Sequence, residues 1–252
     1  KIGPVDLVII ALKATANDAL EKILPPLIGP KTALLTLQNG LGNEEFLSTR
    51  WGAERVMGAL CFVCLNRTEP GVIRHLDHGS ISIGEFGCAP QARTHEIVAA
   101  FQDAGIDAKV VENLMTERWR KLLWNIPFNG LSIASGANVA EVLADEHLRT
   151  LARSLMEEVL DAAGRLDHSI PGEFADFQIE RSWSMGPYRP SSMIDYEEGR
   201  PVEVEAIWGE AWRQGTRARA AMPRLETLYA CIRALARQRL AAMSSPQSFS
   251  PR

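Results

Sequence analysis

The hydrophobic pattern of this chain changes character near residue 112, and that change limits the folds it can adopt. Before this point, continuous apolar runs alternate with helical stretches; the runs are Val5–Leu12, Thr32–Leu37 and Val56–Leu65. Runs of this length predict strands buried on both faces, as in a parallel sheet. From Met115 onward strand signals nearly vanish, and apolar residues recur at helical spacing.

These patterns predict an α/β half followed by an all-α half. Gly71–Leu76 and Ser80–Glu85 flank Asp77-His78-Gly79, a sequence typical of a hairpin turn. We therefore expect an α/β domain with a parallel sheet and an antiparallel extension over 1–112, and an all-helical domain over 113–252. The expected helices are Thr15–Leu24, one N-capped by Asn43, His95–Ala104, Met115–Leu131, Ala140–Leu166, Glu203–Thr216 and Arg224–Met243, before a frayed tail, Ser244–Arg252.

Composition and charge exclude several classes of protein. With 46% apolar, 23% charged and 7% aromatic residues, the chain is not disordered, collagen-like or a disulfide scaffold. Its longest strongly apolar stretch falls well short of the roughly 20 residues of a membrane helix. A net charge of −4 gives no global argument for nucleic-acid binding. Four cysteines in no disulfide framework, and no targeting segment, predict a cytoplasmic protein.

A possible metal motif proves weak. Cys61-x2-Cys64 is followed by His75-x2-His78, which resembles a zinc finger, but the gap between the pairs and the His spacing are both shorter than usual. Both cysteines also lie in an apolar run that predicts a buried strand, where cysteine is a common core residue. We expect no metal site.

Lys121, Asn125 and Asn129 are the first candidates for chemistry, because four-residue steps place them along one helix face. Arginine outnumbers lysine 21 to 6, and no lysine follows Lys121. A retained lysine can release a proton, which arginine cannot. Trp119 and Trp124 would desolvate this ammonium and lower its pKa, as suits a general acid. The alternative is a snorkelling lysine beside two surface amides.

Pro127 lies inside this pattern and frees the carbonyl of Leu123. It predicts a kink or an early end of the helix at the candidate site.

Two further candidates follow the first two predicted strands. Lys13 and Asn39 come at the carboxyl ends of those strands, the edge at which open α/β sheets bind ligands. The glycines of Gln38-Asn39-Gly40-Leu41-Gly42 permit close backbone approach to a ligand. Turns use the same residues, and a charged residue often ends a strand, so a structural role is the alternative.

A third cluster lies in the helical half. It contains Ser191-Ser192-Met193, Asp195, and Gly199-Arg200-Pro201 leading to Glu203, which begins an apolar helix. A carboxylate at a helix start also has an ordinary explanation as a partner of the helix dipole.

Taken together, these motifs resemble the ketopantoate reductase family. The resemblance rests on Asn39 in its Gln-Asn-Gly-Leu-Gly loop, on Lys121-x3-Asn125-x3-Asn129, and on the order of Ser191 and Glu203. Gly71–His75, Ile83-Gly84-Glu85 and Pro223–Tyr229 also look like that family, so nearly the whole chain is covered.

The resemblance implies a Rossmann domain, an all-helical domain and an active site in the cleft between them. It implies an enzyme, an NADP-dependent oxidoreductase of pantothenate and coenzyme A biosynthesis that reduces 2-dehydropantoate with NADPH. The roles it implies are Lys121 as general acid, Glu203 as the carboxylate that binds the substrate hydroxyl, Asn125, Asn129 and Ser191 as substrate-binding residues, and Lys13 and Asn39 as cofactor-binding residues. The expected partner is a small 2-oxo acid. We expect binding neither to nucleic acid nor to a membrane, and a homodimer stays open as the assembly.

Two departures from the family pattern shape our expectations. The family's Gly-x-Gly-x-x-Gly phosphate loop does not occur in this chain, which begins at Lys1 and soon enters a strand. We therefore expect the 252-residue form to bind nucleotide poorly. The residues from Met185 to Pro190, and Ile194-Asp195-Tyr196, also differ from the sequence that is common in the family. A different 2-oxo acid therefore stays open as the substrate.

Two other functions stay open at this point. One is a 3-hydroxy acid dehydrogenase on the same two-domain plan, which also uses a lysine with an asparagine four residues on; the Ser191 to Glu203 cluster argues against it. The other is a catalytically silent nucleotide-binding homologue, against which Lys121 and Glu203 argue.

Overall fold

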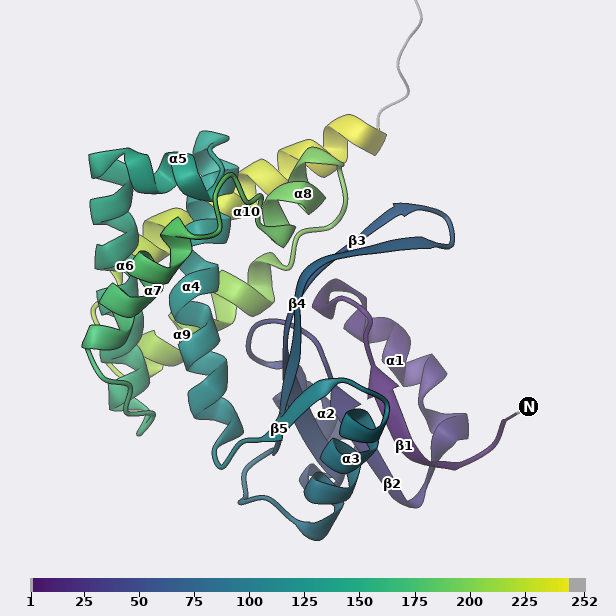
Figure 1. The fold of residues 1–252 in the computed structure, drawn as a ribbon. Helices are drawn as coiled ribbons and strands as arrows, with labels where there is room; N and C mark the ends of the chain where they lie inside the picture. Colours follow the sequence, from purple (N-terminus) through teal and green to yellow (C-terminus); the bar gives the residue numbers. More distant parts are fainter. Residues whose placement is uncertain (1, 245–252) are drawn as a thin grey trace, which may run out of the picture. The chain divides into compact units, whose positions relative to one another are not determined.

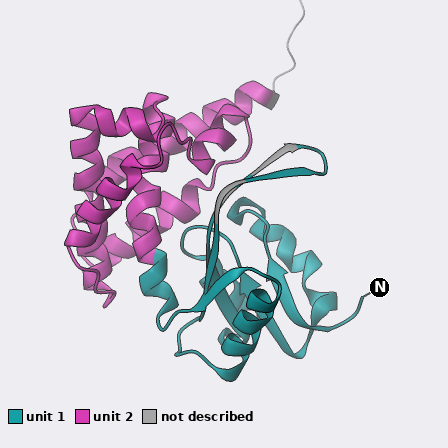
Figure 2. Ribbon diagram, viewed as in Figure 1, with its two compact units in different colours: residues 1–118 teal, residues 119–252 magenta. Residues whose placement is uncertain are grey.

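A computed structural model describes residues 2–244, apart from the side chains of 64, 66–68, 76–78 and 244. The chain forms two compact units, Lys1–Arg118 and Trp119–Arg252 (Figure 2). The strands are β1 (Val5–Ile10), β2 (Ile28–Thr36), β3 (Val56–Glu69), β4 (Val72–Glu85) and β5 (Asp107–Val110). The α-helices are α1 (Asn17–Ile23), α2 (Asn43–Trp51), α3 (Ala92–Asp103), α4 (Leu114–Ser135), α5 (Val139–Ala144), α6 (Glu146–Arg165), α7 (Glu173–Trp183), α8 (Ser191–Glu197), α9 (Glu210–Arg217) and α10 (Pro223–Ser244).

The first unit is built on one five-stranded sheet in the order β1-β2-β3-β4-β5 (Figure 1). β1, β2 and β3 are parallel, as expected for strands joined by helical crossovers. β4 is antiparallel to β3, and β5 is parallel to β4. The prediction of a Rossmann-type parallel sheet with an antiparallel extension is therefore confirmed.

The hairpin turn lies elsewhere than expected. β4 is a single strand that contains Asp77-His78-Gly79, and its partner is β3, with Glu69 paired to Val72. The turn is Pro70-Gly71, where Gly71 has φ 80°, a left-handed conformation that glycine adopts without strain. The prediction of a turn at Asp77-His78-Gly79 was therefore wrong, because irregular pairing lets that sequence continue along the strand.

β1 is less buried than its sequence suggests. Only Ile10 of this strand is buried, and Ile9 is 46% exposed. The prediction of a strand buried on both faces was wrong for β1, because it is an edge strand of the described sheet and pairs only with β2 there.

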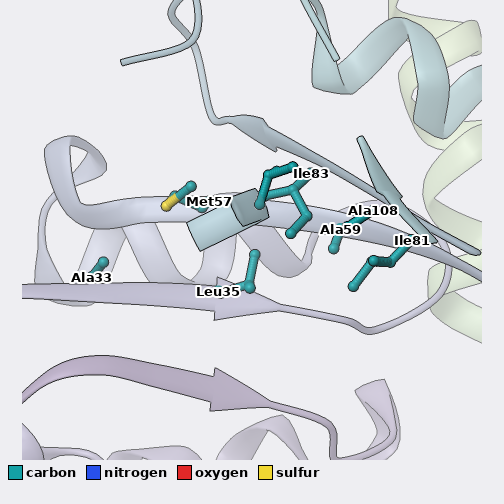
Figure 3. Packing of buried hydrophobic residues seen from close by; sticks show 8 residues of the cluster. Ala33, Leu35, Met57, Ala59, Ile81, Ile83 and Ala108 are labelled. Atoms are coloured by element: carbon teal, nitrogen blue, oxygen red, sulfur yellow. The ribbon is translucent and has the colours of Figure 1, made fainter. Parts of the chain in front are cut away.

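Apolar side chains fill both faces of the sheet. On one face, alternate residues of the strands pack with Val98 of α3 (Figure 3); they are Ala33, Leu35, Met57, Ala59, Ile81, Ile83 and Ala108. On the other face, Leu34 packs with Leu20 of α1 and Leu47 of α2. This alternation follows from the period of two along a strand, and it gives the unit a helix–sheet–helix layering.

In the described part of the second unit every regular element is a helix, as expected. The predicted helix Ala140–Leu166 is two helices, because Asp145 takes an extended conformation and its side chain accepts from the Leu148 amide to cap α6. Helices α7 and α8 have no counterpart among the predicted elements. The expected tail after Ser244 lies outside the described residues. No described helix has the length and hydropathy that crossing a membrane requires.

Candidate functional site

The candidate residues of α4 form one face of a continuous helix. Lys121 is half-buried, while Asn125 and Asn129 are 8% and 2% exposed. The alternative of two surface amides was therefore wrong. Helix α4 continues past Pro127 to Ser135, so the expected early end does not occur. One helix thus places a lysine and two buried amides in line, and buried amides need partners.

Asn129 connects α4 to the start of α8. Its Oδ1 accepts from the backbone amide of Ser192 at 3.0 Å, and its Nδ2 donates to the Asn125 carbonyl at 3.1 Å. Pro190, the N-cap of α8, makes no capping bond through its side chain, so Asn129 satisfies an amide that the helix leaves open. The position of Ser191, the first residue of α8, is therefore tied to α4.

The segment after α8 carries Glu203. Arg200 Nε donates to Oδ1 of the buried Asp195 at 2.9 Å, which closes the turn between α8 and this segment. Glu203 is 6% exposed and lies directly before the helical turns, as its sequence predicted. Its carbonyl accepts from the Ile207 amide at 3.1 Å. A buried carboxylate thus stands at a helix start.

A π-helical segment, Glu205–Gly209, separates Glu203 from α9. Within it Trp208 is fully buried and its indole Nε1 donates to the Ile126 carbonyl of α4 at 3.0 Å. A Cβ at Gly130 would lie 2.9 Å from that Nε1, so glycine permits the close approach. The turn after Glu203 is therefore fastened to α4 between Lys121 and Asn129, and π turns occur often at functional sites.

A charged cluster on the surface surrounds the same π-helical segment. Oε1 of Glu205 accepts from the Tyr229 hydroxyl at 2.8 Å, and Oε2 accepts from Arg213 at 2.7 Å. Burial alone would raise the pKa of Glu205, but these two hydrogen bonds and the nearby charges outweigh it and lower that pKa. Burial and the bond to Glu205 raise the pKa of Tyr229. The cluster therefore favours an ionised Glu205.

The two candidates in the first unit lie at one sheet edge. Lys13 and Asn39 follow the carboxyl ends of β1 and β2, which are parallel neighbours. Lys13 is exposed, and Asn39 is half-buried between the buried residues Gln38 and Gly40. Asn43 was expected to N-cap α2. That prediction was wrong, because Gly42, with φ 88°, is the N-cap, while Asn43 Nδ2 donates to the Asn39 carbonyl at 2.9 Å.

Sequence reasoning missed a buried ion pair beneath the Asn39 loop. Arg118 and Glu44 are 2% and 0% exposed. Nε and Nη2 of Arg118 both donate to Glu44 Oε1, the former at 3.0 Å, and Nη1 donates to the Gln38 carbonyl at 2.6 Å. A side chain at Gly58 would collide with this pair. An arginine among apolar helix positions was the available signal, but its partner lies 74 residues away in sequence.

No cluster of three or more potential metal ligands occurs among the described residues. Cys61 lies in β3, while the side chains of Cys64 and His78 fall outside the described part of the chain.

The fold and these residues define a class: a two-unit protein with a Rossmann-type sheet and an all-helical unit that presents a lysine, amides and a buried carboxylate. The family described as ketopantoate reductase PanE/ApbA matches residues 1–87, and its C-terminal domain matches residues 113–236.

Individual relatives agree with these matches. The 2-dehydropantoate 2-reductase of Nostoc sp. is 40% identical over 234 residues, which cover 91% of this chain and 73% of that protein. The crystal structure of the Geobacter metallireducens 2-dehydropantoate 2-reductase has a TM-score of 0.89 at 43% identity, covering 92% of this chain and 78% of that one. The Methylococcus capsulatus enzyme gives 0.88 at 30% identity, covering 97% and 77%. The chain belongs to the ketopantoate reductase family.

Proposed function

We propose that this protein reduces 2-dehydropantoate, or a closely related 2-oxo acid, to the 2-hydroxy acid with NADPH, on the route to pantothenate. The observation that carries the proposal is the arrangement in the second unit. There the Lys121 face of α4 is fastened by Asn129 to α8 and by Trp208 to the turn after Glu203. Membership of the ketopantoate reductase family supports the same reaction.

The first unit offers donors that fit the nicotinamide side of such a cofactor. An ammonium and an amide, Lys13 and Asn39, follow adjacent parallel strands, at the edge where open α/β sheets bind nucleotides. Gly40 and Gly42 both have positive φ, so the loop backbone turns tightly there without strain. We assign these two residues to cofactor binding.

In the proposed mechanism, Lys121 handles the proton. NADPH, when bound, would supply the hydride that the carbonyl carbon of the substrate accepts. Lys121 donates a proton to the carbonyl oxygen, on which negative charge develops, so that C=O becomes CH–OH. A positioned proton donor contributes about 10²–10⁴-fold to the rate, and the ammonium also stabilises the developing charge.

The other residues orient the substrate. Asn125 and Ser191 bind it, and Glu203 accepts a hydrogen bond from its hydroxyl. Asn129 takes part chiefly by holding the start of α8, because its Oδ1 accepts from the Ser192 amide. Holding the carbonyl in one place lets hydride and proton reach the same group.

The test compares kcat/KM for 2-dehydropantoate and its deoxy analogue. A hydrogen bond to a charged group contributes about 1.5–3 kcal/mol, so the analogue, which cannot donate one to Glu203, is expected to have a kcat/KM lower by roughly 10- to 150-fold. Glu203→Gln should narrow this gap. Glu205→Gln is the matched control, since Glu205 is a largely exposed carboxylate two residues away, and it should leave the gap unchanged.

Other results would revise the proposal. Equal use of both substrates would remove Glu203 from substrate recognition. Reduction of an unrelated 2-oxo acid alone would keep the reductase and replace the substrate, whereas no turnover with any 2-oxo acid would favour a silent homologue. The homodimer and the cytoplasmic location stay predictions; light scattering against the 27.8 kDa chain mass tests the former.

A further inference from the structure

A chain of polar side chains underlies the loop that carries Asn39. The Thr36 hydroxyl donates to Gln38 Oε1 at 2.9 Å, and Gln38 Nε2 donates to Asn17 Oδ1 at 2.7 Å. Asn17 Nδ2 donates to Asn43 Oδ1 at 3.1 Å, and Asn43 Nδ2 donates to the Asn39 carbonyl at 2.9 Å. Each amide accepts through its oxygen and donates through its nitrogen, so the chain runs in one direction and ends on the Asn39 backbone.

Burial restricts the orientations that these hydrogen-bonded side chains can adopt. Thr36, Gln38 and Asn43 are 0%, 4% and 1% exposed, and Asn17 is half-buried. In a low-dielectric environment linked hydrogen bonds reinforce one another, and reversing one amide would place oxygen against oxygen. Each member therefore has a single favourable orientation.

Arg118 provides a second restraint on the same loop. Its Nη1 donates to the Gln38 carbonyl at 2.6 Å, while Asn43 holds the next carbonyl, that of Asn39. Two successive peptide groups are thus fixed by buried donors, while the side chain of Asn39 stays partly exposed. The loop is built so that the placement of Asn39 is predetermined.

We propose that Asn17 and Asn43 are positioning residues for cofactor binding, which act through Asn39 by fixing its backbone. The inference rests on the proposed function, because it takes Asn39 as a contact of NADPH. Pre-ordering a binding residue removes the entropic cost of ordering it when the ligand arrives. Loss of the hydrogen bonds that order Asn39 therefore weakens cofactor binding.

The test is a double-mutant cycle on NADPH affinity, measured by fluorescence titration of the protein produced from its complete gene. Asn43→Ala should weaken binding about 3- to 10-fold, the effect of one lost hydrogen bond. In an Asn39→Ala background the same substitution should change binding by less than about twofold, because the residue it acts through is gone. Asn17→Ala, which breaks the chain without altering α2, should behave in the same way.

Two controls separate positioning from general destabilisation. Thr94→Val removes another buried hydroxyl of the first unit, which donates to Glu85 at 2.6 Å, and it should leave NADPH affinity unchanged. Hydrogen exchange of residues 37–47 should accelerate in Asn17→Ala even without cofactor, because the loop is released.

The outcomes discriminate between the two proposals. Wild-type protein that binds no NADPH would overturn the proposed function. If wild type binds, additive losses for Asn39 and Asn43, an equal loss in Thr94→Val, or unchanged exchange of the loop would each overturn this inference alone.

Discussion

Replacing Arg118 by leucine should destabilise the first unit strongly. The pair with Glu44 is almost fully buried, and Glu44 Oε2 has no hydrogen-bond partner in the described structure, so without Arg118 an ionised carboxylate would stay buried without compensation. Removing one member of a buried pair costs about 3–5 kcal/mol.

The double variant Arg118→Leu/Glu44→Leu sharpens this prediction. Replacing both charges by apolar residues of similar size is often neutral for a buried pair. The bond from Arg118 to the Gln38 carbonyl is still lost, and a hydrogen bond from a charged donor contributes about 1.5–3 kcal/mol. We therefore expect the double variant to lose less stability than Arg118→Leu alone, by roughly 1–3 kcal/mol.

Urea unfolding followed by circular dichroism measures the free energies, and hydrogen exchange in β3 and α2 assigns the loss to the first unit. Independent unfolding of the two units would make a single transition inadequate, so exchange is the decisive measurement. The reasoning would be refuted by a loss below about 1 kcal/mol in Arg118→Leu, or by a double variant less stable than the single one.

Three other perturbations test separate parts of the molecule. Lys121→Ala should lower kcat by about two or more orders of magnitude in steady-state kinetics, with NADPH affinity nearly unchanged. Lys121→Arg should not restore kcat. Near-normal turnover of Lys121→Ala would remove Lys121 from the mechanism. Glu158→Gln should lower the free energy of unfolding in urea by about 1–3 kcal/mol, because the carboxylate of this buried residue accepts from the backbone amides of Arg224 and Leu225 at the start of α10. An unchanged free energy of unfolding would mean that solvent satisfies these two amides in the variant. Glu205 has a lowered folded-state pKa, so its stabilising contribution is present above its ordinary pKa and is lost as pH falls through the folded value; the stability gap between wild type and Glu205→Gln should shrink on acidification, and a gap that widens would contradict the sign.

The sequence was most informative where function and fold depend on local pattern. Four-residue spacing placed Lys121, Asn125 and Asn129 on one helix face, and continuous apolar runs placed Lys13 and Asn39 after parallel strands. It failed where competing local signals had to be ranked: Pro70-Gly71 and Asp77-His78-Gly79 both suggest turns, and only pairing across the sheet decides between them.

Long-range partners were beyond sequence reasoning for a different reason. Glu44 and Arg118 each have an ordinary local explanation, as a helix N-terminal acid and a helix arginine, and no spacing rule connects residues 74 positions apart. The break between α5 and α6 could have been predicted, since Asp145 followed by apolar residues at helical spacing is a helix start signal. The π-helical segment carries no comparable signal, because its apolar residues also satisfy a regular helix.

That π-helical segment makes local helix geometry a determinant of the site. A π turn holds one more residue than the α-turn it replaces, and each residue of an α-helix advances the chain by 100° and about 1.5 Å. If the same residues of Glu205–Gly209 formed a regular α-helix instead, the residue that the π turn absorbs would add its own advance, and Glu203 would rotate by about 100° relative to α9. Every side chain of the site would keep its identity, and Glu203 would face another direction. The register of this short segment therefore specifies the site as firmly as the residues do.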